Sequence, residues 1–249
     1  MADGGIKAIV FDLDGTLYFG DQIAEEAVEA LSILRREGCE LFFLTNNSSK
    51  TRREVWEKLL ELGIEAEENR LYTSACATAR YAAETGVERA FVLGSVGLRS
   101  ELEAAGVRSV PDPECDAVVV GMAREIRIDD LAVAMEALLR RDARLIVANV
   151  DRNFPSASGR ILPGANAVVA ALLGSLDREI PYEMVGKPEP VMLEMICRDH
   201  GMAPDRLCLV GDREESDAEA ARRFGSSWRL VGSRGMSRGL AHQLMEQCR

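Results

Sequence analysis

The chain has 249 residues, of which 47% are apolar, enough to bury the cores of two domains. Its 41 acidic and 30 basic residues give a formal net charge of −11, a surface that repels nucleic acids and anionic lipids, so we exclude both as partners. No window approaches the roughly 20 apolar residues of a membrane span. The six cysteines form no CxxC pair, which predicts reduced thiols in a cytoplasmic protein.

Short apolar runs alternate with amphipathic stretches in the first part of the chain. Residues 7–11 predict a buried strand, and apolar residues between 23 and 34 then recur at helical spacing until Gly38. Residues 40–44 predict the next strand, and a second helix follows over residues 55–62. This βαβα order predicts an α/β fold in which helices cover both faces of a parallel sheet.

The middle of the chain has its own strand–helix rhythm, with strands expected at 90–93, 117–120 and 145–148. A single crossover needs only about a dozen residues, so this stretch is too long to be one connection. We therefore expect residues 86–181 to form an inserted α/β cap domain. Residues 1–85 and 182–249 then form a Rossmann-like core.

The tail returns to the pattern of the first part. Strands are expected at 182–185, 207–210 and 228–231, and helices at 190–199 and 216–224.

A polar cluster directly follows each of four predicted core strands. The clusters contain Asp12, Asp14 and Thr16; Thr45, Asn46 and Asn47; Gly186 and Lys187; and Gly211, Asp212 and Asp217. Each cluster alone is typical of a turn or a helix cap. The carboxyl ends of parallel strands share one edge of a sheet, where ligands bind, so we expect the four clusters to meet in one site.

These residue types suit phosphoryl transfer. Asp12 can act as a nucleophile, and Asp14, two residues on, as general acid and then general base. Asp12, Asp14 and Asp212 offer the hard oxygen ligands that Mg²⁺ prefers. Lys187 adds positive charge for the phosphoryl oxygens.

Thr45 and Asn46 can donate hydrogen bonds to the same phosphoryl group. Other catalytic motifs are absent from the sequence. Its two histidines lie in neither a serine-hydrolase nor an HExxH context, and it contains no GxGxxG or GxxxxGK[ST] segment.

The segments 12–16, 44–48, 185–188 and 211–217 resemble, in chain order, the four motifs of the haloacid dehalogenase superfamily of hydrolases. The long insertion after the second motif is similar to that of the subfamily IIA branch. That branch includes 4-nitrophenyl phosphate, phosphoglycolate, pyridoxal phosphate and nucleotide phosphatases.

The resemblance implies a role for each matching residue. Asp12 would be the nucleophile and Asp14 the acid/base. Thr45, Asn46, Asn47 and Lys187 would bind the phosphate. Mg²⁺ would be held by Asp12, the backbone oxygen of Asp14, and Asp212. Thr16 and Asp217 would contact these ligands or Lys187 without binding the ion themselves.

The resemblance also implies that the insertion selects a small phosphorylated metabolite and allows a homodimer through this cap. The loop 149–155 is its candidate selectivity element, with Arg152 and Phe154 as substrate contacts. The fourth motif departs from the family pattern at Glu214, an acidic residue beside the expected metal site.

Three alternatives share this fold. A dehalogenase would need neither Asp14 nor Asp212. An inactive phosphate-binding regulator would be expected to lose the nucleophile or the lysine, and this sequence keeps both. A phosphotransferase shares the first half-reaction and stays open.

Overall fold

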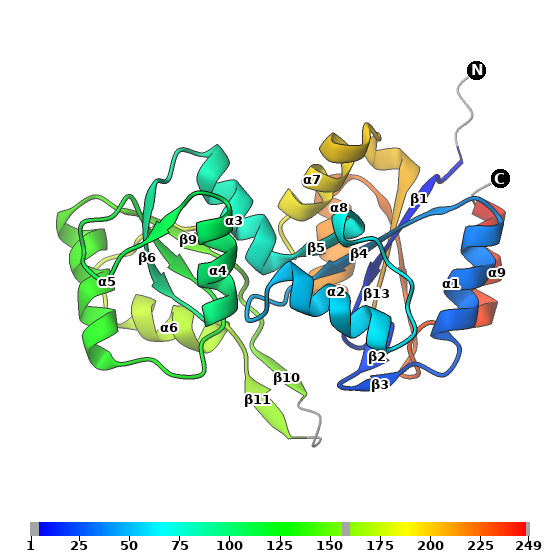
Figure 1. Ribbon diagram of the computed structural model, residues 1–249, viewed down its shortest axis with the longest axis horizontal. Coiled ribbons are helices and arrows are strands. Elements are labelled where there is room, and N and C mark those ends of the chain that lie inside the picture. The colour runs from blue at the N-terminus through cyan, green and yellow to red at the C-terminus, as the bar shows by residue number, and fades with distance from the viewer. Residues whose placement is uncertain (1–4, 156–159, 248–249) are drawn as a thin grey trace. The chain divides into compact units, whose positions relative to one another are not determined.

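The structure is a computed structural model that describes residues 5–155 and 160–247. The chain folds into two compact units, each with a five-stranded sheet (Figure 1). The first unit comprises the chain up to Thr45, Trp56–Tyr72, and the chain from Lys187 onward. The second comprises Asn46–Val55 and Thr73–Gly186.

The sheet of the first unit carries the strands that precede three of the four polar clusters. Its order is β14 (Ser227–Leu230), β13 (Leu207–Gly211), β1 (Ala8–Asp12), β4 (Glu40–Thr45) and β5 (Leu71–Thr73). The central strand β1 is buried along its whole length and pairs in parallel with both β4 and β13. In this register Asp12 lies opposite Leu44, and Phe11 opposite Val210, so the three polar strand ends share one edge.

Helices cover both faces of this sheet, as expected (Figure 1). They are α1 (Ala27–Arg36), α7 (Val191–His200), α8 (Glu219–Phe224) and α9 (Arg238–Gln247), while α2 (Arg52–Glu61) begins in the second unit and ends in the first. In α1, Ala27, Ala30, Leu31 and Leu34 are buried, which is the spacing of one apolar helix face. A hairpin of β2 (Tyr18–Phe19) and β3 (Gln22–Ile23) follows the first polar cluster.

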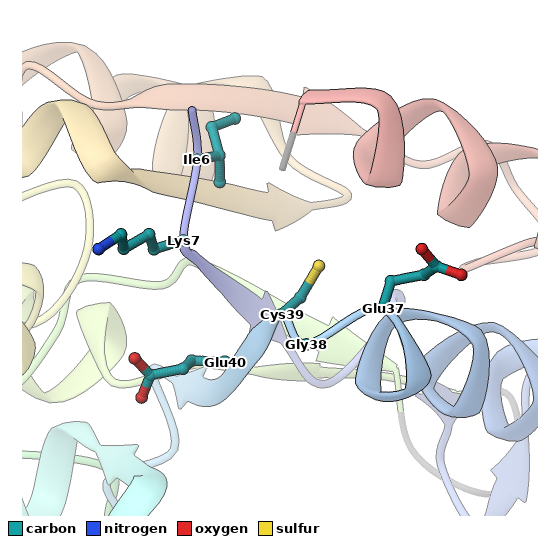
Figure 2. Close-up of a pocket in the computed structure, with 6 residues that line it drawn as sticks. All are labelled: Ile6, Lys7, Glu37, Gly38, Cys39 and Glu40. Carbon is teal, nitrogen blue, oxygen red and sulfur yellow. The ribbon is translucent and has the colours of Figure 1, made fainter. Parts of the chain in front are cut away.

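The opposite edge of the first sheet has a small pocket of about 180 Å³ (Figure 2). It is lined by Ile6, Lys7, Glu37, Gly38, Cys39 and Glu40. These residues lie at the amino ends of β1 and β4, whereas the candidate catalytic residues lie at the carboxyl ends. The pocket is therefore separate from the candidate site.

The second unit is also a parallel α/β layer. Its sheet has the order β12 (Glu183–Met184), β9 (Arg144–Val147), β8 (Ala117–Val120), β6 (Arg89–Leu93) and β7 (Arg108–Ser109). Its helices are α3 (Ser74–Glu84), α4 (Val96–Ala104), α5 (Ile128–Arg140) and α6 (Asn166–Gly174). A hairpin of β10 (Asn153–Pro155) and β11 (Ile161–Pro163) lies between β9 and α6.

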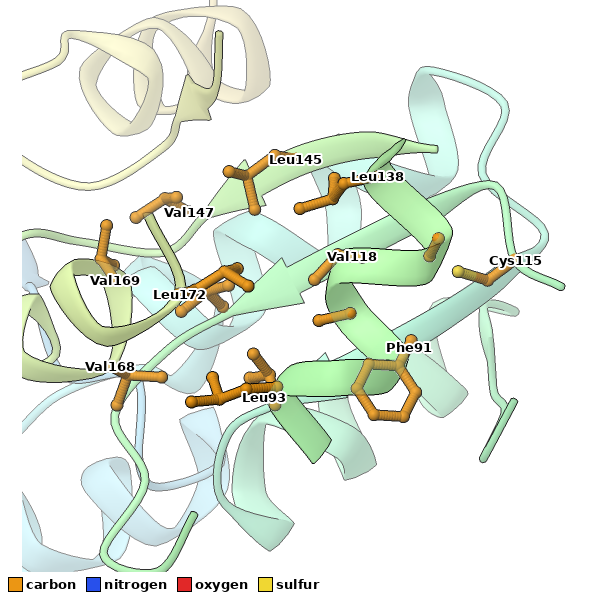
Figure 3. Packing of buried hydrophobic residues seen from close by; sticks show 14 residues of the cluster. Phe91, Leu93, Cys115, Val118, Leu138, Leu145, Val147, Val168, Val169 and Leu172 are labelled. Carbon is orange, nitrogen blue, oxygen red and sulfur yellow. The ribbon is translucent and has the colours of Figure 1, made fainter. Parts of the chain in front are cut away.

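Apolar side chains of α5 and α6 pack on one face of this sheet (Figure 3). Leu138 of α5 and Leu172 of α6 share a buried cluster with Val118 and Leu145 of the strands. Alternate residues of a strand point to the same face, which explains why Val118 and Val120 both join the cluster. The second unit therefore has its own core.

The bounds of the second unit differ from the expected 86 and 181. Residues 182–185, expected as a core strand, contain the two-residue strand β12, which pairs with β9 of the second sheet. Glu183 holds this edge strand: it accepts hydrogen bonds from Arg144 Nε at 2.8 Å and from the Tyr81 hydroxyl at 2.6 Å. The chain returns to the first unit only at Lys187.

Candidate active site

Asp12 is the last residue of β1, and its side chain is almost fully buried. One carboxylate oxygen accepts a hydrogen bond from Lys187 Nζ at 2.5 Å, and the other faces the Thr16 hydroxyl at 3.4 Å. Burial raises the pKa of Asp12, and the positive charge of Lys187 opposes this rise. The strand end thus presents a carboxylate that a buried cation stabilises.

Lys187 is a buried cation held between two carboxylates. It is only 3% exposed, and its Nζ also donates to Asp217 Oδ1 at 2.6 Å. Burial acts to lower the pKa of Lys187, but Asp12 and Asp217 outweigh it and raise that pKa above its usual value. The side chain is therefore an ammonium that Asp217 holds in place beside Asp12.

A tight turn after β13 positions the carboxylates of the fourth cluster. A π-helical turn spans Glu214–Ala218 and begins two residues before the expected helix 216–224, and α8 follows it. Asp217 Oδ2 accepts a hydrogen bond from the backbone N–H of Arg213 at 3.0 Å, which closes the turn. A Cβ on Gly211 would lie 2.2 Å from Asp217 Cγ, so only glycine leaves room for this arrangement.

Gly15 brings the first cluster against the fourth. Its φ of +88° lies in the left-handed region, and a Cβ there would come within 2.3 Å of Asp212 Oδ2. Two reasons therefore require glycine at this position: its left-handed backbone conformation and the close approach of the Asp212 carboxylate.

Three carboxylates converge where a divalent cation is expected. Oxygens of Asp12, Asp212 and Asp217 lie within 4.8 Å of one another. Hard carboxylate oxygens in such a group fit Mg²⁺. Both oxygens of Asp217 already accept hydrogen bonds, from Lys187 and from the Arg213 N–H. Asp217 therefore holds Lys187, and Asp12 and Asp212 stay the predicted side-chain ligands of the ion.

Asp14 is not a member of this group, and it accepts a hydrogen bond from Tyr18. The Tyr18 hydroxyl donates to Asp14 Oδ2 at 3.2 Å. Although Asp14 is open to solvent, the surrounding protein raises its pKa by desolvation, and the positive charge of Lys58 opposes this. A raised pKa suits a group that must carry a proton at one stage of a reaction.

Tyr18 and Lys58 are neighbours of Asp14 that sequence reasoning missed. Lys58 Nζ lies 4.1 Å from the centre of the Tyr18 ring and donates to the Gly20 carbonyl at 2.7 Å. Its position in helix α2 gave no local signal. Tyr18 offered one, since it stands directly after the first polar cluster at the start of the β2–β3 hairpin.

The second cluster divides between the two units. Thr45 ends β4 and is buried in the first unit, whereas Asn46 and Asn47 belong to the second. Asn47 Oδ1 accepts hydrogen bonds from the backbone N–H groups of Ser49 at 2.9 Å and Lys50 at 3.1 Å. This part of Asn47 therefore shapes the turn after β4.

Arg152 and Phe154, the expected substrate contacts, lie at the β10–β11 hairpin of the second unit. Arg152 is exposed, and Phe154 is half-buried opposite Leu162. Their contacts with a substrate stay a prediction.

The arrangement of carboxylates and lysine around the end of β1 defines a phosphatase of the haloacid dehalogenase type, and comparisons with known proteins agree. A family model described as haloacid dehalogenase-like hydrolase matches residues 9–108, and a second, HAD-hydrolase-like model matches residues 184–245. The chain is 33% identical over 228 residues to the sugar-phosphatase AraL of Bacillus subtilis, covering 90% of this chain and 82% of that protein.

Solved structures show the same likeness. A p-nitrophenyl phosphatase from Archaeoglobus fulgidus matches with a TM-score of 0.85 and 32% identity, over 97% of this chain and 92% of that one. A glycerol phosphate phosphatase from Mycobacterium tuberculosis, in complex with magnesium, matches with a TM-score of 0.82 and 32% identity, over 94% and 69% of the two chains. This chain belongs to the haloacid dehalogenase-like hydrolases, in subfamily IIA, and is a phosphoric monoester hydrolase.

Within residues 5–155 and 160–247, no helix is both long and apolar enough to cross a bilayer.

Proposed function

We propose that this phosphatase hydrolyses a small phosphate monoester in the presence of Mg²⁺, through a phosphoryl intermediate on Asp12. One observation carries the proposal: Lys187 lies between Asp12 and Asp217, at 2.5 Å and 2.6 Å, with the Asp212 carboxylate beside them. This arrangement supports Asp12 as the carboxylate nucleophile, Lys187 as a fixed cation and the carboxylates as oxygen ligands for a metal.

In the first half-reaction, an Asp12 oxygen attacks the phosphorus and the bond to the leaving-group oxygen breaks. Asp14, in its acid form, gives its proton to that oxygen. The product alcohol leaves, and Asp12 carries the phosphoryl group. The Lys187 ammonium offsets negative charge on the phosphoryl oxygens, while Asp217 keeps the ammonium in position.

In the second half-reaction, Asp14 is a carboxylate and accepts a proton from water. The water oxygen bonds to phosphorus, the bond from phosphorus to Asp12 breaks, and inorganic phosphate is released. Asp12 and Asp14 then return to their starting forms. The Tyr18 hydroxyl bonds to Asp14 and limits the directions in which its carboxylate can point.

Asp12 and Asp212 would hold Mg²⁺, with the backbone oxygen of Asp14 as a further ligand. When bound, the ion supplies charge neutralisation between the carboxylates and the substrate phosphate. The magnesium complex of the mycobacterial glycerol phosphate phosphatase supports this assignment.

The substrate that we propose is a phosphorylated sugar or polyol. Relatives named as a sugar phosphatase and a glycerol phosphate phosphatase support this class. The second unit would act as the cap that selects among such substrates, through Arg152 and Phe154. Unpaired thiols at Cys39, Cys115 and Cys208 fit a cytoplasmic protein. Light scattering would test the homodimer that the resemblance allows.

The test is phosphoenzyme formation with 4-nitrophenyl phosphate labelled in its phosphoryl group. Wild type with Mg²⁺ should release phosphate and, after acid quenching, retain label, and chelator should abolish both. Asp12→Asn should not become labelled. Asp14→Asn should become labelled and turn over slowly, because nitrophenolate leaves with little need of a proton but water still needs a base. Labelling of Asp12→Asn to the wild-type level would refute the nucleophile.

The same assay, run with added alcohols as acceptors, separates hydrolysis from phosphotransfer. Hydrolysis predicts inorganic phosphate as the main product in their presence. A panel of sugar phosphates, glycerol phosphate, phosphoglycolate, pyridoxal phosphate and nucleotides would then define the substrate. Equal rates across the panel would contradict selection by the second unit.

A further inference from the structure

Asn149 follows strand β9 in the second unit, and its side chain is 2% exposed. Its amide Nδ2 donates to the backbone carbonyl of Asn46 at 2.7 Å and to the hydroxyl oxygen of Ser48 at 3.0 Å. The two N–H bonds of the amide therefore both point at the segment Asn46–Ser48. Loss of this amide would leave buried hydrogen-bond acceptors without a partner, which costs free energy.

The same segment is held by other parts of the second unit. The Asn46 carbonyl also accepts a hydrogen bond from the Ser74 hydroxyl at 2.8 Å, so both of its lone pairs are used. The Ser48 hydroxyl oxygen accepts from the backbone N–H of Met122 at 2.9 Å. Asn46 Nδ2 donates to Asp151 Oδ1 at 3.1 Å. Asn149 lies at the centre of this network.

The segment is also joined directly to the first sheet. Asn46 is the residue after Thr45, the last residue of β4, and Leu44 lies opposite Asp12 in the register of that sheet. Consecutive Cα atoms are about 3.8 Å apart, so Asn46 cannot leave the strand end. The direction in which the backbone continues after Thr45, however, is set by the hydrogen bonds of the Asn46 carbonyl and side chain.

We propose that Asn149 is a positioning residue for phosphate binding. It fixes the backbone of Asn46 and Asn47 so that this turn can receive the phosphoryl group. The inference rests on the proposed function, because it takes the turn after β4 as the phosphate-binding element. It assigns to Asn149 a role in phosphate affinity, although its side chain is buried and bonded to protein.

The chemistry of the site requires an amide at this position. An aspartate has nearly the same shape but would direct a carboxylate oxygen at the Asn46 carbonyl, where a donor is needed. The two oxygens would repel each other, and the buried carbonyl would lose one partner. Asn149→Asp therefore removes the donor and keeps the volume, whereas Asn149→Ala removes both.

The experiment compares wild type with Asn149→Asp, Asn149→Ala and Ser74→Ala. For each protein, kcat and KM for 4-nitrophenyl phosphate are measured with Mg²⁺, together with the inhibition constant of inorganic phosphate and the midpoint of thermal unfolding. Asn69→Asp, at an exposed position of the first unit, is the control for the same chemical change.

Asn149→Asp should raise both KM and the phosphate inhibition constant by roughly tenfold or more, the size expected from one lost buried hydrogen bond. Ser74→Ala should move both constants in the same direction by a smaller factor, because Asn149 still bonds the carbonyl. Asn69→Asp should match wild type. A lower unfolding midpoint in Asn149→Asp, with unchanged constants at a temperature where it is folded, would overturn the proposal.

Ser74→Ala keeps the test valid if the Asn149 variants do not fold. An unchanged phosphate inhibition constant in Ser74→Ala would then also overturn the proposal. Failure of the proposed function appears differently, since wild type would show no phosphate release.

Discussion

The Tyr18 hydroxyl donates a hydrogen bond to the Asp14 carboxylate at 3.2 Å, while the Tyr18 ring lies 4.1 Å beneath the ammonium of Lys58. Lys58 in turn bonds to the Gly20 carbonyl and pairs with Asp21 at 3.7 Å, both in the turn of the β2–β3 hairpin. The proposed general acid is thus oriented by a hairpin that a lysine of α2 holds.

Tyr18→Phe should therefore lower kcat without a loss of fold. A hydrogen bond of this kind contributes about 0.5–1.5 kcal/mol, so kcat for an alkyl phosphate should fall by roughly two- to tenfold. The effect on the first step with 4-nitrophenyl phosphate should be smaller, because that leaving group needs little protonation. Steady-state rates with both substrates check this. An equal loss with both would show that Tyr18 supports the fold and not the acid.

Lys187→Met should abolish phosphatase activity and destabilise the protein. Removal of the ammonium leaves Asp12 and Asp217 buried without their cation, and breaking such a pair typically costs about 3–5 kcal/mol. Urea unfolding of Lys187→Met and of Lys7→Met measures the cost. Lys7 is exposed at the opposite edge of the same sheet, so it controls for the loss of a lysine.

The pH dependence of that cost follows from the raised pKa of Lys187. A raised pKa in the folded state gives stability that is fully present below the unfolded pKa of about 10.4 and is lost as the pH rises through the folded value. The difference in unfolding free energy between wild type and Lys187→Met should therefore not change with the ionisation of Lys187 from pH 6 to about 9. A difference that decays within this window would contradict the charged lysine.

Gly15→Ala should impair the metal site beyond the ordinary cost of a left-handed residue. Gly38 is a matched control, since its φ of +83° is similar and a Cβ there meets no atom within 4 Å. Gly38→Ala should lose about 1 kcal/mol of stability and keep its activity. Gly15→Ala should lose more stability and need a higher Mg²⁺ concentration for half-maximal activity, because its Cβ displaces Asp212. Equal Mg²⁺ requirements in the two variants would refute this displacement.

Arg152→Ala and Phe154→Ala should change substrate preference and leave the chemistry intact. A lost polar contact or a misfitted ring changes the discrimination between competing substrates by roughly 1–3 kcal/mol. The ratio of kcat/KM between substrates of a panel should therefore change by about tenfold. The aryl phosphate should change far less. kcat/KM across the panel measures this, and a uniform loss for every substrate would show that the hairpin only supports the fold.

The central strands were predictable because their apolar runs are continuous. The expected strand at 40–44 is β4, Glu40–Thr45, and the strand expected at 207–210 is β13, Leu207–Gly211. β5 escaped prediction, and β12 was predicted as a strand but in the wrong sheet, for a physical reason. They contain three and two residues, and such short strands depend on their neighbours more than on their own pattern.

The site was predictable in position at Asp12 and Asp212, which lie at the carboxyl ends of β1 and β13, and their roles stay predictions. It was not predictable where a side chain reaches across from another element. Asn149 shows this limit, because no local pattern predicted the hydrogen bonds of its amide to Asn46 and Ser48. The two partners of each hydrogen bond are 101 or 103 residues apart, so no local sequence pattern indicates the contact.

The chain crosses between its units at four peptide bonds, after Thr45, Val55, Tyr72 and Gly186. This has a consequence for chimeras that exchange the second unit between relatives. A graft cut at residues 86 and 181 would separate Ser74 and the Asn46–Ser48 segment from Asn149, and Glu183 from Arg144. A graft that also transfers residues 46–55 and 73–85, and extends to Gly186, would keep these partners together and should yield the more stable hybrid.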